Sequence, residues 1–120
     1  MTTANAGHIP PYVAGQEVFV ESGLPLGLSQ DSTYPETNFT LRFNEQLTLL
    51  TDGVVEAQTK KGDLFGFERT AAVARDSAAE IARAAREFGQ EDDITVVTLR
   101  RVDSSTPAAS GVTMLLPSSA

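Results

Sequence analysis

The chain has 120 residues, of which 41% are hydrophobic and 21% are charged, and its 9 Lys and Arg stand against 16 Asp and Glu, for a formal charge of −7. This length predicts one domain, and the acidic balance excludes the basic surface that nucleic-acid binding requires. With no cysteine and a single histidine, disulfides, cysteine nucleophiles and multi-histidine or thiolate metal sites are also excluded.

The start of the chain predicts no targeting segment. Residues 1–5 have neither the basic nor the apolar region of a signal peptide. No apolar run in the chain approaches the roughly 20 residues that span a bilayer. We therefore expect a soluble, cytoplasmic protein with no membrane partner.

Residues 1–28 predict a short strand, a turn, a strand pair and a loop. Pro10-Pro11 removes two amide donors and forbids helix. Gly15-Gln16 separates the apolar segments 12–14 and 17–20, which is typical of a tight hairpin. The glycines and proline of segment 22–28 break any period, so we expect this apolar loop to cover the core. If exposed, it would suit a protein partner.

The next segment predicts two strands. Polar and apolar residues alternate over residues 37–44, which is the period of a half-buried strand. A turn at Asn44-Glu45 leads into a returning strand at residues 46–50. That strand ends at Thr51-Asp52-Gly53, which places an aspartate at the carboxyl end of a buried strand.

Two helices should follow, after an exposed turn that contains Lys60-Lys61. The first helix is expected over residues 68–75. Ser77 and Glu80 have the spacing of a capping box at the start of the second. Apolar residues then recur on one helical face, and Gly89 is a typical helix stop.

The end of the chain combines a strand with a segment of different composition. The β-branched residues 94–99 predict the last strand of a domain that covers residues 1–102. Residues 103–120 are rich in Ser, Thr, Ala and Pro and predict a flexible tail. The only apolar cluster of this tail, at residues 112–116, could instead dock on an exposed sheet edge.

Acidic residues gather at two points where a turn meets a buried strand, Thr51-Asp52-Gly53 with Glu56 and the run Glu91-Asp92-Asp93. Oxygen ligands of this kind hold Mg²⁺ or Mn²⁺, and two aspartates with bound water suit metal-assisted hydrolysis. The alternative is that both segments are ordinary solvated turns. His8, in a proline-containing turn, could act as a general acid or could simply bind backbone groups.

Five motifs occur in order along the chain: Ala-Asn-Ala-Gly-His-Ile-Pro-Pro (4–11), Gly-Leu-Pro-Leu-Gly-Leu (23–28), Leu-Leu-Thr-Asp-Gly-Val-Val-Glu-Ala (49–57), Leu-Phe-Gly (64–66) and Gln-Glu-Asp-Asp-Ile-Thr-Val-Val (90–97). Together they closely resemble the SpoIIE/RsbU-like branch of the PP2C (PPM) serine/threonine phosphatases. The resemblance covers residues 2–101.

The resemblance implies an α+β fold with antiparallel sheets flanked by helices, of which this chain would form one half of a β-sandwich with two helices. It also implies a two-metal centre of Mn²⁺ or Mg²⁺ that activates water for direct attack on phosphoserine or phosphothreonine. The usual substrates of this branch are phosphorylated anti-anti-sigma factors. Asp52 and Asp92 match metal-ligand aspartates, Glu56 matches an acid that holds metal-bound water, and Asp93 is a neighbouring acid.

One element of the family is missing from this chain. The Asp-x-x-Gly-His-Gly motif, whose aspartate bridges both metals, lies upstream of the motifs present, and no aspartate precedes Asp31. We therefore expect the C-terminal part of a catalytic domain, with weak metal binding, little activity alone, and sheet edges open to a second copy or to the N-terminal half. The alternatives are a non-catalytic binding or oligomerisation module and a Mg²⁺-dependent hydrolase of small phosphoesters.

Overall fold

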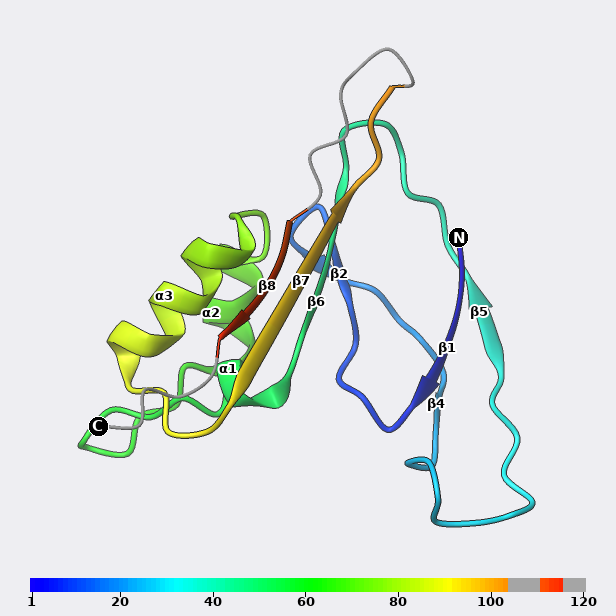
Figure 1. Cartoon of the computed structure of the whole chain (residues 1–120), viewed down its shortest axis with the longest axis horizontal. Helices are drawn as coiled ribbons and strands as arrows, with labels where there is room; N and C mark the ends of the chain where they lie inside the picture. Colours follow the sequence, from blue (N-terminus) through cyan, green and yellow to red (C-terminus); the bar gives the residue numbers. More distant parts are fainter. Residues whose placement is uncertain (104–110, 116–120) are drawn as a thin grey trace.

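A computed structural model describes residues 1–103 and, beyond them, the backbone of one strand. The fold contains two sheets and a helical layer (Figure 1). The smaller sheet has the order β4-β1-β5 and consists of β1 (Thr2–Ala6), β4 (Ser22–Gly23) and β5 (Glu36–Asn38). The larger sheet has the order β3-β2-β6-β7-β8 and consists of β2 (Tyr12–Val13), β3 (Gln16–Glu17), β6 (Gln46–Leu50), β7 (Ile94–Arg100) and β8 (Gly111–Leu115).

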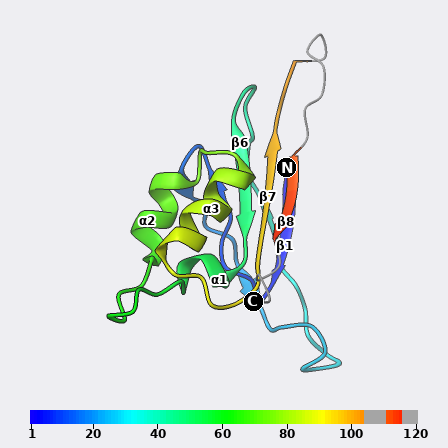
Figure 2. The same cartoon turned by 60° about the vertical axis from the view of Figure 1, so that its left-hand side comes forward.

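The larger sheet is antiparallel throughout, and its helices lie on one face (Figures 1 and 2). They are α1 (Asp52–Val55), α2 (Gly66–Val73) and α3 (Ala78–Phe88). The predicted α+β class is confirmed, with a short third helix, α1, that the sequence did not predict. None of the helices in the described part of the chain is long and apolar enough to cross a membrane.

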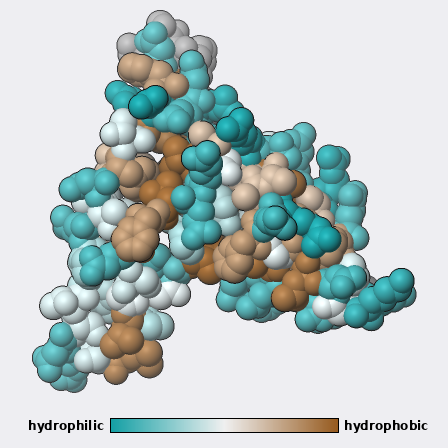
Figure 3. Space-filling model, turned by 180° about the vertical axis from the view of Figure 1, so that it is seen from behind, coloured by the Kyte–Doolittle hydropathy of each residue, from teal (hydrophilic) through white to brown (hydrophobic). Residues whose placement is uncertain are grey.

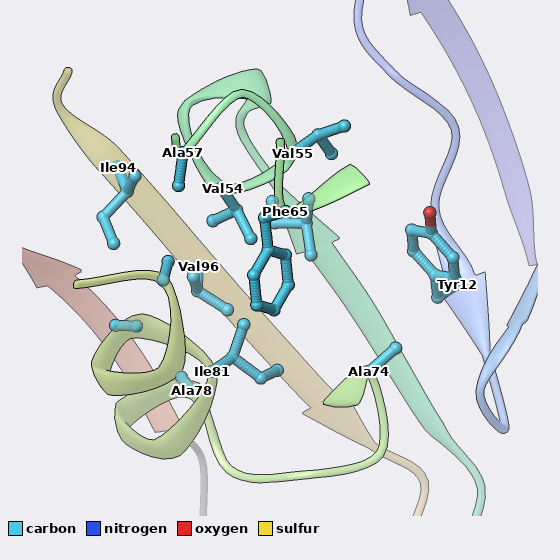
Figure 4. Close-up of a cluster of buried hydrophobic side chains, with 13 residues drawn as sticks. Tyr12, Val54, Val55, Ala57, Phe65, Ala74, Ala78, Ile81, Ile94 and Val96 are labelled. Carbon is cyan, nitrogen blue, oxygen red and sulfur yellow. The ribbon is translucent and has the colours of Figure 1, made fainter. Parts of the chain in front are cut away.

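The core lies between the helices and the face of β6 and β7 that they cover (Figure 4). Ile81 on α3 is completely buried, and the small side chains of Ala82 and Ala85 let α3 approach the sheet closely. The predicted capping box begins α3, since the Ser77 hydroxyl accepts a hydrogen bond from the Glu80 amide. Burial of one such aliphatic side chain stabilises the fold by about 1.5–3 kcal/mol.

The smaller sheet has almost no core of its own, because Asn5 is the only buried residue in its three strands. The prediction that segment 22–28 covers the core is therefore wrong. β4 carries this segment away from the edge of the smaller sheet, and Leu24, Leu26 and Leu28 are all more than half exposed.

A cleft of about 340 Å³ separates the two sheets, with β1 on one side and β6 and β7 on the other. Seen from behind, the two parts of the molecule diverge, and hydrophobic residues lie in the notch between them (Figure 3). The helical side of the larger sheet is therefore fully packed, whereas the opposite side is open.

The strand predicted over residues 37–44 is shorter and pairs differently. β5 ends at Asn38 and pairs with β1, not with β6. The pairing with β1 extends to Phe39, whose amide donates to the Met1 carbonyl at 3.0 Å. Beyond it, the Arg101 guanidinium donates to the Leu41 carbonyl and lies over the Phe43 ring, 4.2 Å from the centroid. The pattern predicted the alternation but not the pairing with β1.

The predicted tail, residues 103–120, falls largely outside the described residues. Within it, β8 pairs antiparallel with β7, with Ile94 opposite Leu115 and Thr98 opposite Gly111. This pairing is the edge docking that the apolar cluster allowed as an alternative. The flexibility predicted for residues 104–110 and 116–120 concerns residues that the structure does not describe.

Ile81→Ala should lower the free energy of unfolding by about 2–5 kcal/mol, because the lost side chain leaves a cavity between α3 and the sheet. Urea unfolding followed by circular dichroism measures this loss. Arg83→Ala, on the exposed face of the same helix, is the matched control and should change the free energy by less than about 0.5 kcal/mol. Equal losses in both variants would contradict the assigned core.

Tyr12 is buried, and its hydroxyl has no hydrogen-bond partner in the described part of the chain. Burial, and then the charge of Glu17, raise the pKa of Tyr12. The folded state thus favours the protonated form of Tyr12, and this preference adds to the free energy of unfolding. The added stability is fully present below about pH 10, the pKa in the unfolded chain, and is lost as the pH rises through the folded pKa.

Tyr12→Phe should therefore leave the free energy of unfolding near pH 7 within about 1 kcal/mol of the wild type, because it removes an unpaired hydroxyl. Above about pH 10 the variant should lose less stability than the wild type. Urea titrations on both sides of that pH measure the difference. An identical fall in both proteins would contradict a buried, protonated Tyr12.

Candidate functional site

The site lies at the end of the larger sheet where β6 ends and β7 begins. These strands are antiparallel, with Leu50 opposite Val96. The segment that follows β6 and the segment that precedes β7 therefore leave the sheet at the same end of the strands. Two hydrogen bonds extend the pairing: the Thr51 amide donates to the Thr95 carbonyl at 3.0 Å, and the Thr95 amide donates to the Thr51 hydroxyl at 2.9 Å. The two acidic motifs are therefore neighbours.

Gly53 allows the two segments to approach closely. A Cβ atom at this position would lie 2.5 Å from the Asp93 carbonyl oxygen and 2.9 Å from the Ile94 side chain. Since real Cβ atoms essentially never come within 3.0 Å of such atoms, only glycine permits this packing. The Thr-Asp-Gly motif thus requires its glycine for the contact between α1 and the segment that precedes β7.

A hollow of about 460 Å³ opens beside this contact, and its lining residues are Gly53, Glu56, Gln58, Leu64, Glu91 and Asp92. Residues from both acidic motifs line it, Glu56 from the end of α1 and Asp92 from the connection between α3 and β7. The Asp92 carboxylate also accepts a hydrogen bond from the Asp93 amide at 2.8 Å, which holds its side chain against the turn.

The four predicted site residues all lie at this end of the sheet, but they do not all face the hollow. Glu56 and Asp92 line it, whereas Asp52 and Asp93 do not, and all four residues are exposed. Asp52 begins α1, and its backbone carbonyl accepts a hydrogen bond from the Glu56 amide. The structure therefore gathers the acidic segments at one edge while leaving two of the carboxylates outside the hollow.

The carboxylates have the right chemistry for Mg²⁺ or Mn²⁺, because both are hard cations that prefer oxygen ligands. However, within residues 1–103 no three His, Asp or Glu side chains gather closely enough to hold a metal ion. The described residues therefore match the predicted metal in donor type but do not form a complete ligand set.

His8 lies elsewhere, on the cleft between the two sheets. Its amide and carbonyl both bond the Asn5 side chain, and its Nδ1 lies 2.9 Å from the Ile9 carbonyl oxygen. This is the backbone-binding role that the sequence left open beside the general-acid role.

Sequence reasoning did not select three residues that line the hollow. Glu91 lies in the acidic run but was not predicted as a site residue, because three acidic residues in a row do not show which of them lines the site. Gln58 and Leu64 form an isolated bridge that closes the turn containing Lys60, and only the tertiary structure brings that turn to the site.

Residues 1–102 match the family model described as Stage II sporulation protein E (SpoIIE). The protein named Phosphoserine phosphatase RsbU, from Bacillus subtilis (strain 168), is 30% identical over 115 residues, which cover 83% of this chain and 34% of that protein. This chain thus spans about a third of the length of that curated relative. No solved structure matches the chain.

Gly53→Ala should push α1 away from the segment before β7 and lower the free energy of unfolding by about 1–3 kcal/mol, as overpacking does. The amide NMR shifts of residues 92–94 should change as well, because the new methyl group meets them directly. Gly27→Ala, where φ is +89° but a Cβ atom meets nothing within 4 Å, should lose stability through its backbone alone and leave those shifts unchanged. Unaltered shifts in Gly53→Ala would contradict the close approach.

Proposed function

This chain belongs to the SpoIIE family, in the SpoIIE/RsbU-like branch of the PP2C phosphatases, and we propose that it contributes to a protein serine/threonine phosphatase that acts on a phosphorylated anti-anti-sigma-type protein. The family depends in general on Mn²⁺ or Mg²⁺. The observation that supports the proposal most directly is the antiparallel pairing of β6 and β7, which joins the Thr-Asp-Gly and Glu-Asp-Asp motifs at one sheet edge.

In this proposal Asp52 and Asp92 are metal ligands, Glu56 orients a water molecule and Asp93 supplies a further carboxylate nearby. A bound divalent cation would stabilise the charge on the transferring phosphoryl group and lower the pKa of a water molecule. The part played by this chain is to hold the donors: the hydrogen bonds between Thr51 and Thr95 keep the two motifs together.

The proposal concerns a part of the enzyme, because the chain spans about a third of its curated relative. The missing bridging aspartate would come from the N-terminal half of the domain, and the open cleft between the sheets gives that half, or a second copy, a place to pack. The cytoplasmic location remains a prediction from the sequence alone.

A non-catalytic binding or oligomerisation module is the second candidate. It is favoured by the incomplete set of carboxylates in the described residues. It is also favoured by large exposed side chains in the segment between β3 and β5, of which Phe19 is 82% exposed. Such a module would use the same fold without turning over a phosphoester.

Asp52→Asn and Asp92→Asn should each weaken Mn²⁺ binding by about tenfold or more, because each removes a charged oxygen ligand. Isothermal titration calorimetry at millimolar Mn²⁺ measures the affinity. Asp31→Asn removes the same charge from an exposed loop and is the matched control.

Phosphate release from a phosphoserine protein, measured on the same samples, should be weak for the chain alone. Rapid release that Asp52→Asn abolishes would exclude the binding-module candidate. Absence of Mn²⁺ binding, or equal weakening in Asp31→Asn, would instead overturn the metal roles.

A further inference from the structure

The hairpin of residues 58–64 borders the acidic hollow and carries both lysines of the chain. Gln58 and Leu64 pair as an isolated bridge at its base, and both line the hollow. Lys60 and Lys61 lie at its tip and are exposed. Figure 2 shows this hairpin projecting from the body between α1 and α2, at the sheet end that holds the site.

Hydrogen bonds give the hairpin a defined shape. The Thr59 amide donates to the Asp63 carbonyl, the Gly62 amide donates to the Thr59 carbonyl, and the Asp63 amide donates to the Thr59 hydroxyl, all within 3.1 Å. The Gln58 amide also donates to the carbonyl of Gly89, directly after α3. The tip is therefore held at a fixed position beside the hollow.

The two lysines are the cations available on this rim. No hydrogen bond or ion pair engages either ammonium group within residues 1–103. Arg69, the other cation beside the hairpin, donates to the Leu64 and Phe65 carbonyls and lies over the Phe88 ring. In a chain of net charge −7, these two lysines, with the exposed Asp63 in the same hairpin, stand next to a hollow lined by the acidic residues Glu56, Glu91 and Asp92.

We propose that Lys60 and Lys61 bind acidic side chains of the phosphorylated protein substrate, a few residues away from the phosphorylated residue. This inference rests on the proposed function, in which Asp52 and Asp92 hold the metal at the end of the sheet that this hairpin borders. Lys60 and Lys61 are the central residues of the turn that the hydrogen bond from the Gly62 amide to the Thr59 carbonyl closes, so both stand at the tip, about one to two residues (roughly 3–7 Å) beyond the bridge. With the length of the lysine side chains added, they reach acidic residues a few positions away from the phosphorylated residue of an extended substrate.

The test uses the full chain and three synthetic peptides of one length: a phosphoserine peptide with glutamates at the second and third flanking positions, the same peptide without phosphate, and a phosphoserine peptide with lysines instead. Fluorescence anisotropy measures binding at about 50 mM salt, where surface charges are weakly screened. Lys60→Gln/Lys61→Gln is compared with Arg42→Gln/Arg83→Gln, two exposed residues away from the hollow, so that both double variants lose the same charge.

The lysine variant should bind both glutamate peptides about three- to tenfold more weakly and leave binding of the lysine peptide unchanged, whereas the arginine variant should match the wild type. Equal weakening in both variants would show an effect of net charge alone and overturn the inference. So would unchanged binding in the lysine variant, or no binding of a glutamate peptide by the wild type at millimolar concentration.

The peptide without phosphate keeps this inference separate from the proposed function. If the chain binds no Mn²⁺ and releases no phosphate, but the lysines still decide binding of that peptide, the phosphatase proposal fails and the docking hairpin stands. If Mn²⁺ binds through Asp52 and Asp92 but the lysine variant binds the peptides as the wild type does, the docking role is wrong and the metal roles stand.

Discussion

The register between β6 and β7 is the constraint on which the rest of the site depends. Because these strands run antiparallel with Leu50 opposite Val96, two motifs about forty positions apart in sequence must leave the sheet together. The paired hydrogen bonds of Thr51 and Thr95 extend that register one step beyond the strand. A shift of one residue would turn the side chains of β6 to opposite faces and separate the acidic segments.

The two sheets differ in how much of their surface is buried, because the helices cover only the larger one. α2 and α3 bury one face of the larger sheet, where Leu50, Ile81 and Val96 are almost completely inaccessible. The smaller sheet has strands of two to five residues and nearly no buried side chain. A sheet of this kind needs a cover to be stable on its own, which agrees with a chain that spans a third of its relative.

Several elements could be predicted from the sequence because local chemistry determines them. The capping box of Ser77 and Glu80, the helical apolar face that follows it and the β-branched run of β7 all appear in the structure as expected. Pairing could not be predicted in the same way. Residues 37–44 have the period of a strand, yet β5 pairs with β1 and not with β6, and Arg101 contacts Leu41 and Phe43 from about sixty positions away.

The sequence by itself determined the family, the strands β6 and β7 and the two acidic motifs, because these depend on residue order and local periodicity. Only the tertiary structure decided which carboxylates face a common hollow, that Glu91 joins them, and that the 58–64 hairpin lies beside them. The physical reason is that side-chain direction at a strand end depends on the turn and on the packing of distant segments. The clearest case of such packing is the close approach of the Gly53 backbone to the Asp93 carbonyl.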